Sequence, residues 1–221
     1  VGIRGGLGPE ATVLVMQRII AATPAADDAD HIPLIVHQNP AVPSRIRRLI
    51  EGRGEDPGPV LVQMARDLQA AGARALAMPC NTAHAYAPQI IAATPLPFLD
   101  MRAATVAALP GGRIGMLASP AVRITGAFDA AFAAAGITPV WPADEAPVLD
   151  LIRRVKRGDT GAGARATMAD LGRQMALRSD HLLVACTELS LLTPALTVPF
   201  TDSLDCLVTA ICAFATAGGA G

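Results

Sequence analysis

The stretch Ala77-Met78-Pro79-Cys80-Asn81-Thr82-Ala83-His84 decides how the rest of this sequence is interpreted. The apolar run 75–78 predicts a buried strand, and Asn81-Thr82 is a typical start signal for a helix over 83–93. A cysteine at such a turn lies among free backbone N–H groups and at the positive end of the helix dipole. Both effects favour the thiolate over the thiol, so the position suits a reactive cysteine.

The same pattern occurs a second time, in Leu182-Leu183-Val184-Ala185-Cys186-Thr187-Glu188-Leu189. An apolar run again leads into a cysteine, and Thr187 is the expected helix cap. The upstream segments 1–12 and 113–120 also match, because each predicts a strand, a turn and a helix opened by proline. The offset is 113 positions between the first strands (Gly2 to Gly115) and 106 positions between the two cysteines. Near-equal offsets indicate one unit that is roughly duplicated.

Strands that alternate with helices predict parallel sheets covered by helices. We therefore expect an α/β fold of two pseudo-symmetric parallel-sheet domains, residues 1–98 and 99–201, with the active site in the cleft between them. A last helix, 202–217, is capped by Asp202-Ser203 and is expected to pack back on the first half. Both strand–cysteine turns then lie at the carboxyl ends of their sheets, where such folds bind ligands. If the halves face each other, the two sulfurs enter one cleft, on the order of 7 Å apart with a substrate carbon between them.

The remaining elements follow from apolar periodicity and from proline and glycine punctuation. Cys206 and Cys212 lie inside the apolar last helix, where we expect inert core thiols. The expected helices cover 9–20, 60–71, 120–135, 148–157 and 162–177, and the expected strands cover 32–36, 137–140 and 181–185.

The composition limits the function classes that remain open. The chain has 221 residues, 52% of them apolar and only 3% aromatic, with a formal net charge of -1. A nucleic-acid partner is not expected of a near-neutral chain with so few aromatic side chains. No run of 18 apolar residues predicts a membrane span, and no basic-then-apolar signal opens the chain. Four cysteines without a C-x-x-C pair predict reduced thiols in a cytoplasmic protein.

Two loops near the amino terminus are candidates for ligand binding. Gly5-Gly6-Leu7-Gly8 either makes a tight turn or lets backbone N–H groups approach an anion. It lacks the third glycine of a dinucleotide fingerprint, and strand 32–36 is followed by His37-Gln38-Asn39 rather than by an acid for a ribose. Arg45, in the loop after that strand, either clamps a carboxylate in two-pronged fashion or is a solvated arginine before a helix.

Two other residues leave alternatives open. His84, four residues after Cys80, is a packed or surface histidine, a helper of the thiol or a metal ligand, and no neighbouring set completes a tetrahedral metal site. Lys156 is the only lysine, so a cofactor held as a Schiff base would have to use it. Its charged helical stretch looks solvated, so we do not expect that chemistry.

Two symmetric cysteines suggest two-base chemistry at a carbon acid. One thiolate removes a proton from the carbon, and the opposite thiol delivers a proton to the other side, so that the stereocentre inverts. Cysteine suits this task because its pKa, about 8.5, can be tuned close to the operating pH. Backbone N–H groups at Asn81-Thr82 and Thr187-Glu188 are placed to bind a substrate's α-carboxylate and stabilise the developing charge.

Four motifs carry a family resemblance that spans nearly the whole chain. The sequence resembles the aspartate/glutamate racemase family, specifically its aspartate racemase branch, in residues 5–12, Cys80-Asn81-Thr82-Ala83-His84, Cys186-Thr187-Glu188-Leu189 and Thr201-Asp202-Ser203. The resemblance implies two α/β domains with pseudo-twofold symmetry, a cleft between them, no cofactor and a homodimer. It also implies a small-molecule acidic amino acid, aspartate or glutamate, as the substrate.

The resemblance assigns roles to particular residues. It makes Cys80 and Cys186 the two acid/base residues, and Arg45 and Lys156 the ligands of the substrate's side-chain carboxylate. It makes Asn81, Thr82 and Thr187 the ligands of the α-carboxylate, beside the substrate-binding backbone of Glu188. The chain departs from the family pattern at Ser44, where Asp is usual, and at Ala118-Ser119-Pro120-Ala121, where a Thr-Gly-Thr type run is usual. Because both cysteines are kept, we expect action on L and D forms.

Three rival functions remain at the level of the sequence. A decarboxylase or cis–trans isomerase of the same superfamily would act on dicarboxylic acids without an amine. A non-catalytic binding protein for acidic amino acids would keep Arg45 and Lys156 but need neither thiol. A redox or thiol-metal protein is disfavoured by the absence of a C-x-x-C pair.

Overall fold

The computed structural model describes residues 1–218 and contains two four-stranded parallel sheets. The first has the order β2-β1-β3-β4 and the second the order β6-β5-β7-β8, so both follow the same path. The predicted α/β fold of two pseudo-symmetric parallel sheets is thereby confirmed. The strands are β1 (Gly2–Gly5), β2 (Ile35–Gln38), β3 (Leu76–Ala77), β4 (Phe98–Leu99), β5 (Arg113–Ala118), β6 (Thr138–Val140), β7 (His181–Ala185) and β8 (Phe200–Asp202).

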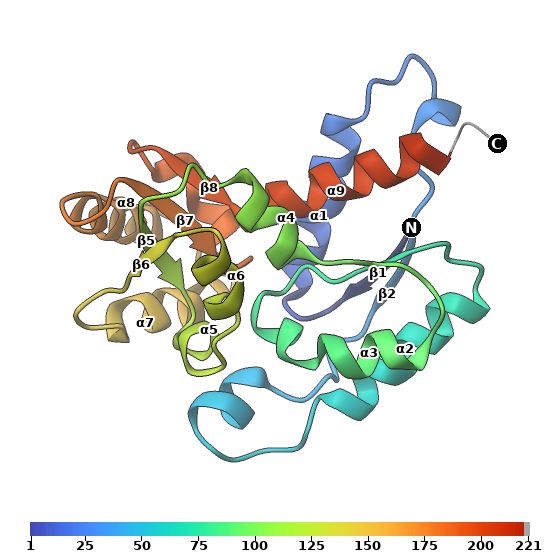
Figure 1. The fold of residues 1–221 in the computed structure, drawn as a ribbon, viewed down its shortest axis with the longest axis horizontal. Coiled ribbons are helices and arrows are strands. Elements are labelled where there is room, and N and C mark those ends of the chain that lie inside the picture. The colour runs from blue at the N-terminus through green and yellow to red at the C-terminus, as the bar shows by residue number, and fades with distance from the viewer. Residues whose placement is uncertain (219–221) are drawn as a thin grey trace.

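Helices cover both sides of each sheet (Figure 1). The α-helices are α1 (Pro9–Ala22), α2 (Gly58–Ala70), α3 (Ala87–Ala93), α4 (Met101–Ala108), α5 (Pro120–Ile124), α6 (Asp129–Ala134), α7 (Ala146–Val155), α8 (Ala162–Ala176) and α9 (Ser203–Gly218). The other helical segments, which are of 3-10 or π type, are η1 (Asp28–Asp30), η2 (Ile46–Ile50), η3 (Thr82–Tyr86) and η4 (Leu189–Ala195). Among the residues described, no helix is both long and apolar enough to cross a bilayer.

Four apolar clusters form the core, one on each side of each sheet. On the first sheet, α2 and α3 cover one side, while α1 and α9 cover the other through residues such as Val15 and Leu207. On the second sheet, α7 and α8 cover one side and the segment of α5 and α6 covers the other. Burial of these aliphatic side chains is the main favourable term in folding. We propose a division of the chain within β4, between residues 98 and 99.

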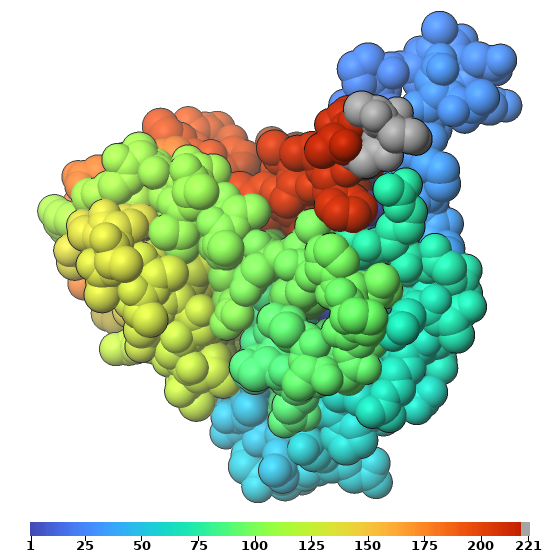
Figure 2. Space-filling view, turned by 45° about the vertical axis from the view of Figure 1, so that its right-hand side comes forward, coloured from blue at the N-terminus to red at the C-terminus, as the bar shows by residue number. Residues whose placement is uncertain are grey.

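The last helix lies beside the first one. Asp202 caps α9, because its Oδ1 accepts a hydrogen bond from the Leu204 N–H at 2.9 Å. Figure 1 shows α9 running alongside α1. Figure 2 shows the segment between α1 and β2 projecting from the body next to the end of α9. A minor cavity there is lined by Thr23, His31 and Cys212.

Three predicted elements differ from the structure. The expected helix 120–135 is two helices, because Gly126 adopts φ 60° and turns the chain between α5 and α6. The expected helix 83–93 begins as η3 and becomes α-helical only at Ala87, with Pro88 in its first turn. The strand expected at 32–36 is displaced toward the carboxyl terminus, to β2, where Ile35 is the first residue paired with β1.

Candidate active site

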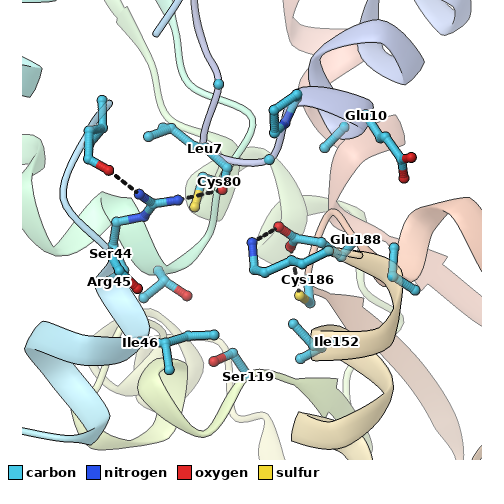
Figure 3. Close-up of a pocket in the computed structure, with 18 of the residues that line it drawn as sticks. Leu7, Glu10, Ser44, Arg45, Ile46, Cys80, Ser119, Ile152, Cys186 and Glu188 are labelled. Carbon is cyan, nitrogen blue, oxygen red and sulfur yellow. Dashed lines mark hydrogen bonds and ion pairs between the residues drawn. The ribbon is translucent and has the colours of Figure 1, made fainter. Parts of the chain in front are cut away.

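One cavity of about 450 Å³ lies where the two sheets present their carboxyl ends. The chain leaves β1 and β3 toward opposite sides of the first sheet, and it leaves β5 and β7 toward opposite sides of the second. This creates a crevice at the carboxyl ends of those strands. The cavity is lined by Gly6 after β1, Cys80 after β3, Ser119 after β5 and Cys186 after β7. The duplicated topology therefore brings the two cysteines to one cavity, from different halves of the chain (Figure 3).

The glycine loop after β1 serves both as a tight turn and as a close approach to the site. Gly6 has φ 85°, a left-handed conformation that favours glycine. Gly8 is extended, but a Cβ on it would lie 2.7 Å from Glu188 Oε1 across the cavity. A residue with a side chain at position 8 would therefore collide with the Glu188 carboxylate.

Hydrogen bonds hold both backbone groups of Cys80, the N–H and the carbonyl. Its side chain lines the cavity, although the residue is only 7% exposed. Its N–H donates to the Met78 carbonyl at 2.8 Å, and its carbonyl lies 2.8 Å from His84 Nδ1. His84 is a packed histidine, fully buried, and burial lowers its pKa to about 4. Within residues 1–218 no group of three His, Cys, Asp or Glu side chains could hold a metal.

Cys186 has a different partner, a carboxylate. Its Sγ donates to Glu188 Oε2 at 3.2 Å. Burial raises the pKa of the Cys186 thiol well above its usual value, and the negative charge of Glu188 raises it further, against the opposing effect of Lys156. At neutral pH Cys186 is therefore a thiol rather than a thiolate.

Lys156 reaches the cavity, although its side chain is still 32% exposed. It is the residue that follows α7, and its Nζ forms an ion pair with Glu188 Oε1. Burial is the largest single effect and acts to lower the pKa of Lys156, but the charge and hydrogen bond of Glu188, together with Cys186 and Cys80, make the net shift upward. Lys156 is therefore a cation whose charge is already shared with Glu188.

Arg45 also lines the cavity, but most of its guanidinium faces the backbone. Nη1 donates to the carbonyls of Val42 and Pro43 at 3.3 and 3.0 Å, and Nη2 donates to the Leu7 carbonyl at 2.6 Å. Nε is buried without a partner in the part of the chain that the structure describes. Two-pronged binding of a carboxylate would require these backbone contacts to be exchanged.

Only one of the residues expected to bind the α-carboxylate lines the cavity. Thr82 lines the cavity, whereas Asn81 and Thr187 are buried and lie outside its lining. Neither makes the helix cap expected of it. Asn81 donates through Nδ2 to Ser203 Oγ at 2.8 Å, and Glu188 occupies the cap position of η4 in place of Thr187. The Asn81 Oδ1 and Thr187 Oγ1 atoms are buried without partners among the described residues.

Some residues of the site were missed by reasoning from sequence. Its wall includes Glu10 at the start of α1, Ile46 in η2 and Ile152 in α7. The carboxylate of Glu188, rather than its N–H, makes the contacts described above. The spacing Cys-x-Glu was a usable signal for that role, because a carboxylate two residues from a thiol is close enough to share its proton.

The sequence and the fold both resemble those of known proteins. Residues 5–211 match the family model described as Asp/Glu/Hydantoin racemase. The chain is similar to the Picrophilus torridus aspartate racemase, with 29% identity and a TM-score of 0.89, over 98% of this chain and 94% of that one. An aspartate racemase homologue from Pyrococcus horikoshii is 19% identical, with a TM-score of 0.73 over 97% and 98% of the two chains. A glutamate racemase isoform from Bacillus anthracis is 16% identical, with a TM-score of 0.68 over 99% and 82%. The last two show likeness of fold alone.

Proposed function

The chain belongs to the Asp/Glu/hydantoin racemase family and is an amino-acid racemase, and from that premise we propose its substrate and mechanism. We propose cofactor-independent racemisation of an acidic amino acid, aspartate first and glutamate second. Cys80 and Cys186 act as the two bases on opposite sides of the α-carbon. The 29% identity with an aspartate racemase supports the choice of aspartate.

One observation carries the mechanism: a single cavity is lined by two cysteines that occupy equivalent positions in two equivalent sheets. Inversion of a stereocentre needs a proton acceptor on one side of the carbon and a proton donor on the other. A near-symmetric pair meets this need in both directions, because the reverse reaction only exchanges the two roles. The reaction is thus expected from both L and D substrates.

The surroundings of Cys186 support a defined starting state for that thiol. Cys186 carries its proton, which it donates to Glu188. In the direction that starts from this state, Cys80 removes the α-proton as thiolate and Cys186 delivers its own proton to the opposite side. The Cys186 thiolate left behind lies near the Lys156–Glu188 pair, whose cation stabilises the new negative charge.

The cations of the cavity support an acidic substrate. Arg45 and Lys156 come from different halves of the chain and line the same space. We propose that they bind the side-chain carboxylate, and that Thr82 and the backbone after Cys186 bind the α-carboxylate. Asn81 and Thr187 contribute from the buried layer behind the cavity. The Ser44 and Ser119 positions, where the chain departs from the family pattern, lie in the lining and are candidates for tuning substrate choice.

The test is chiral chromatography of L- and D-aspartate and L- and D-glutamate after incubation with the protein, together with uptake of deuterium from solvent at the α-carbon. We expect both enantiomers of aspartate to reach the same mixture. Cys80→Ala and Cys186→Ala should each abolish racemisation, while Cys212→Ala, a cysteine outside the cavity, should leave it unchanged. Full racemisation in either of the first two variants would refute the two-base mechanism.

The same experiments separate the rival functions. Aspartate binding by calorimetry, without racemisation or solvent exchange, would indicate a binding protein. Turnover of a dicarboxylic acid that has no amine would indicate the decarboxylase or isomerase branch. The homodimer, the absence of a cofactor and the cytoplasmic location rest on the resemblance and the composition, and they stay predictions.

A further inference from the structure

His84 links the Cys80 loop to the start of α4 by two hydrogen bonds. Its Nδ1 lies 2.8 Å from the Cys80 carbonyl oxygen, and its Nε2 accepts from the Met101 N–H at 3.3 Å. A backbone N–H can only donate, so Nε2 carries no proton in this arrangement. The imidazole proton is therefore on Nδ1, where it is donated to the Cys80 carbonyl.

This bond completes the fixation of the Cys80 backbone. The Cys80 N–H is already bound to the Met78 carbonyl, across the rigid residue Pro79. With its carbonyl held by His84, neither peptide unit beside Cys80 is free to rotate, so the direction of the Cα–Cβ bond is set. That direction determines where Sγ lies in the cavity.

The equivalent cysteine needs no such side chain. The Cys186 carbonyl accepts from the backbone N–H groups of Leu189 and Ser190 at 2.9 and 3.2 Å. Ser190 follows Cys186 by four positions, as His84 follows Cys80. At the same position of the repeat, an imidazole thus does for Cys80 what a backbone N–H does for Cys186.

We propose that His84 is a positioning residue that fixes the Cys80 thiol for reaction by holding the Cys80 carbonyl. The inference rests on the proposed function for its effect on turnover. It gives a role to a buried residue that is not part of the cavity lining and whose two hydrogen bonds both go to backbone atoms. Near-attack geometry is demanding, and a misplacement of about 1 Å costs on the order of 100-fold in rate.

The charged groups around His84 keep it in the required form. Asp100 Oδ1 lies 3.7 Å from Nε2 and favours protonation, while burial and the guanidinium groups of Arg4 and Arg102 oppose it. Burial dominates and lowers the pKa of His84 to about 4, so the neutral ring persists at any pH near neutrality. The ring of Phe98 packs against the imidazole, with centroids 5.4 Å apart.

Two amide substitutions separate the two hydrogen bonds of His84. In His84→Asn the amide N–H stands in for Nδ1–H and keeps the bond to the Cys80 carbonyl, but loses Met101. In His84→Gln the longer side chain reaches Met101 and loses the carbonyl. We expect His84→Asn to keep most of the wild-type kcat, and His84→Gln to lower kcat by roughly 10- to 100-fold with KM little changed. His37→Asn, at a histidine on β2 outside the cavity, is the matched control.

A second readout does not depend on turnover. Alkylation of each cysteine by iodoacetamide is followed by mass spectrometry of its peptide, with Cys186 as the internal reference. Release of the carbonyl opens the loop locally, so His84→Gln should speed Cys80 alkylation by about fivefold or more relative to Cys186, and His84→Asn should not. Equal Cys80 rates in the wild type and both variants would overturn the proposal. If the wild type racemises no acidic amino acid, the proposed function fails, but this ratio still decides whether His84 holds Cys80.

Discussion

At the scale of single residues, the two cysteines differ in what surrounds them. Cys186 faces Glu188, whereas Cys80 is held through its backbone. In the proposed mechanism, a near-symmetric reaction is thus carried out by two thiols in unequal surroundings. This asymmetry makes the pH dependence of the two directions informative, because each cysteine is an acid in one direction and a base in the other.

Glu188→Gln should shift the pH profile downward. The Glu188 charge raises the pKa of Cys186 in addition to burial, so its removal lowers that pKa. Where Cys186 acts as acid, activity is lost as pH rises through its pKa, and this basic limb should move to lower pH. Where Cys186 acts as base, the acidic limb should move the same way. The measurement is kcat/KM against pH from each enantiomer, with the exposed Glu55→Gln as control. Unmoved limbs in both directions would contradict the assignment.

Gly8→Ala should impair catalysis without destabilising the fold. Gly8 has an extended backbone, φ −149°, which alanine adopts without strain. The new Cβ would, however, lie 2.7 Å from Glu188 Oε1 and displace that flexible carboxylate from its partners. We expect kcat to fall by roughly 10- to 100-fold. Thermal denaturation should place the variant beside Gly161→Ala, whose Cβ meets only Asp159 at 3.7 Å. A large drop in Tm for Gly8→Ala would point instead to a structural clash.

Arg4→Met should stabilise the protein. Arg4 on β1 is 0% exposed, and its three guanidinium nitrogens have no hydrogen-bond partner among the described residues. Its guanidinium carbon lies 5.1 Å from the Phe98 ring centroid, which returns only part of the desolvation cost. Replacement of buried charge by an apolar side chain of similar volume often stabilises by about 1–4 kcal/mol. A rise in Tm would follow, at about 2–4 °C per kcal/mol for a chain of this size. A fall in Tm would show that the guanidinium is better satisfied than the structure indicates.

At the scale of the elements, the repeated strand–cysteine pattern predicts more than any single motif. Apolar runs followed by turns locate the strands because buried parallel strands read as continuous hydrophobic segments. Their duplication then predicts that Cys80 and Cys186 line one cavity, because equivalent strands end at equivalent places. The departures, at 120–135 and 83–93, arise where one residue overrides the periodicity: Gly126 through its left-handed backbone and Pro88 through its missing N–H.

Contacts between residues far apart in the chain cannot be predicted from the local sequence. Asn81 is a good cap by local rules, yet its amide binds Ser203, 122 positions away. Lys156 belongs to a charged helical stretch, yet Glu188 draws it into the cavity. The bond from His84 Nδ1 to the Cys80 carbonyl is local, but the neutral tautomer that it needs is set by Met101. Such long-range partners depend on the closed fold and not on any window of sequence.

Gly126→Ala should destabilise the protein by about 1 kcal/mol or more, because alanine is strained at positive φ. The φ of Gly126 is 60°, and the added Cβ would lie 2.8 Å from Asp129 Oδ2. Gly163→Ala, inside α8, is the matched control. Its backbone is helical and its Cβ meets only the end of Arg154, so it should stabilise by about 0.5–1 kcal/mol. Urea denaturation gives both values, and equal signs would contradict the assignment of the turn at Gly126.

At the scale of the whole molecule, the two halves are joined by contacts on both sides of the cavity. Between η2 and α7, which both contribute lining residues, Glu51 and Arg153 form a 3.4 Å ion pair, here called the rim pair. Behind the cavity, Arg18 of α1 donates to Asp202 at the end of β8 and to the Ser190 carbonyl in η4, at 2.6 and 2.9 Å. The rim pair is half exposed and contributes little to stability. The Arg18–Asp202 pair is the stronger link, because Asp202 is buried.

Arg18→Met should therefore destabilise the protein in a pH-dependent way. Removing one partner of a fully buried pair costs roughly 3–5 kcal/mol, because the other charge is left without compensation. Arg18 is 20% exposed and also pairs with the exposed Asp205, so we expect a smaller cost here. Burial already raises the pKa of Asp202 above its ordinary value, although Arg18 opposes this, and the substitution should raise that pKa further. A carboxyl group whose folded pKa is raised destabilises the fold as pH rises through its titration range, and the loss disappears at low pH, where the group is protonated in both states.

The destabilisation by Arg18→Met should accordingly be largest at pH 7 and smallest near pH 4, as urea denaturation across that range would show. Asp202→Asn in the same chain removes the uncompensated charge, while its side-chain oxygen still accepts from Leu204 and Ser190. The double variant should therefore recover much of the stability at pH 7 and lose the pH dependence. If Arg18→Met costs the same at both pH values, Asp202 is not left charged and buried. The link between the halves would then be the bond from Arg18 to the Ser190 carbonyl.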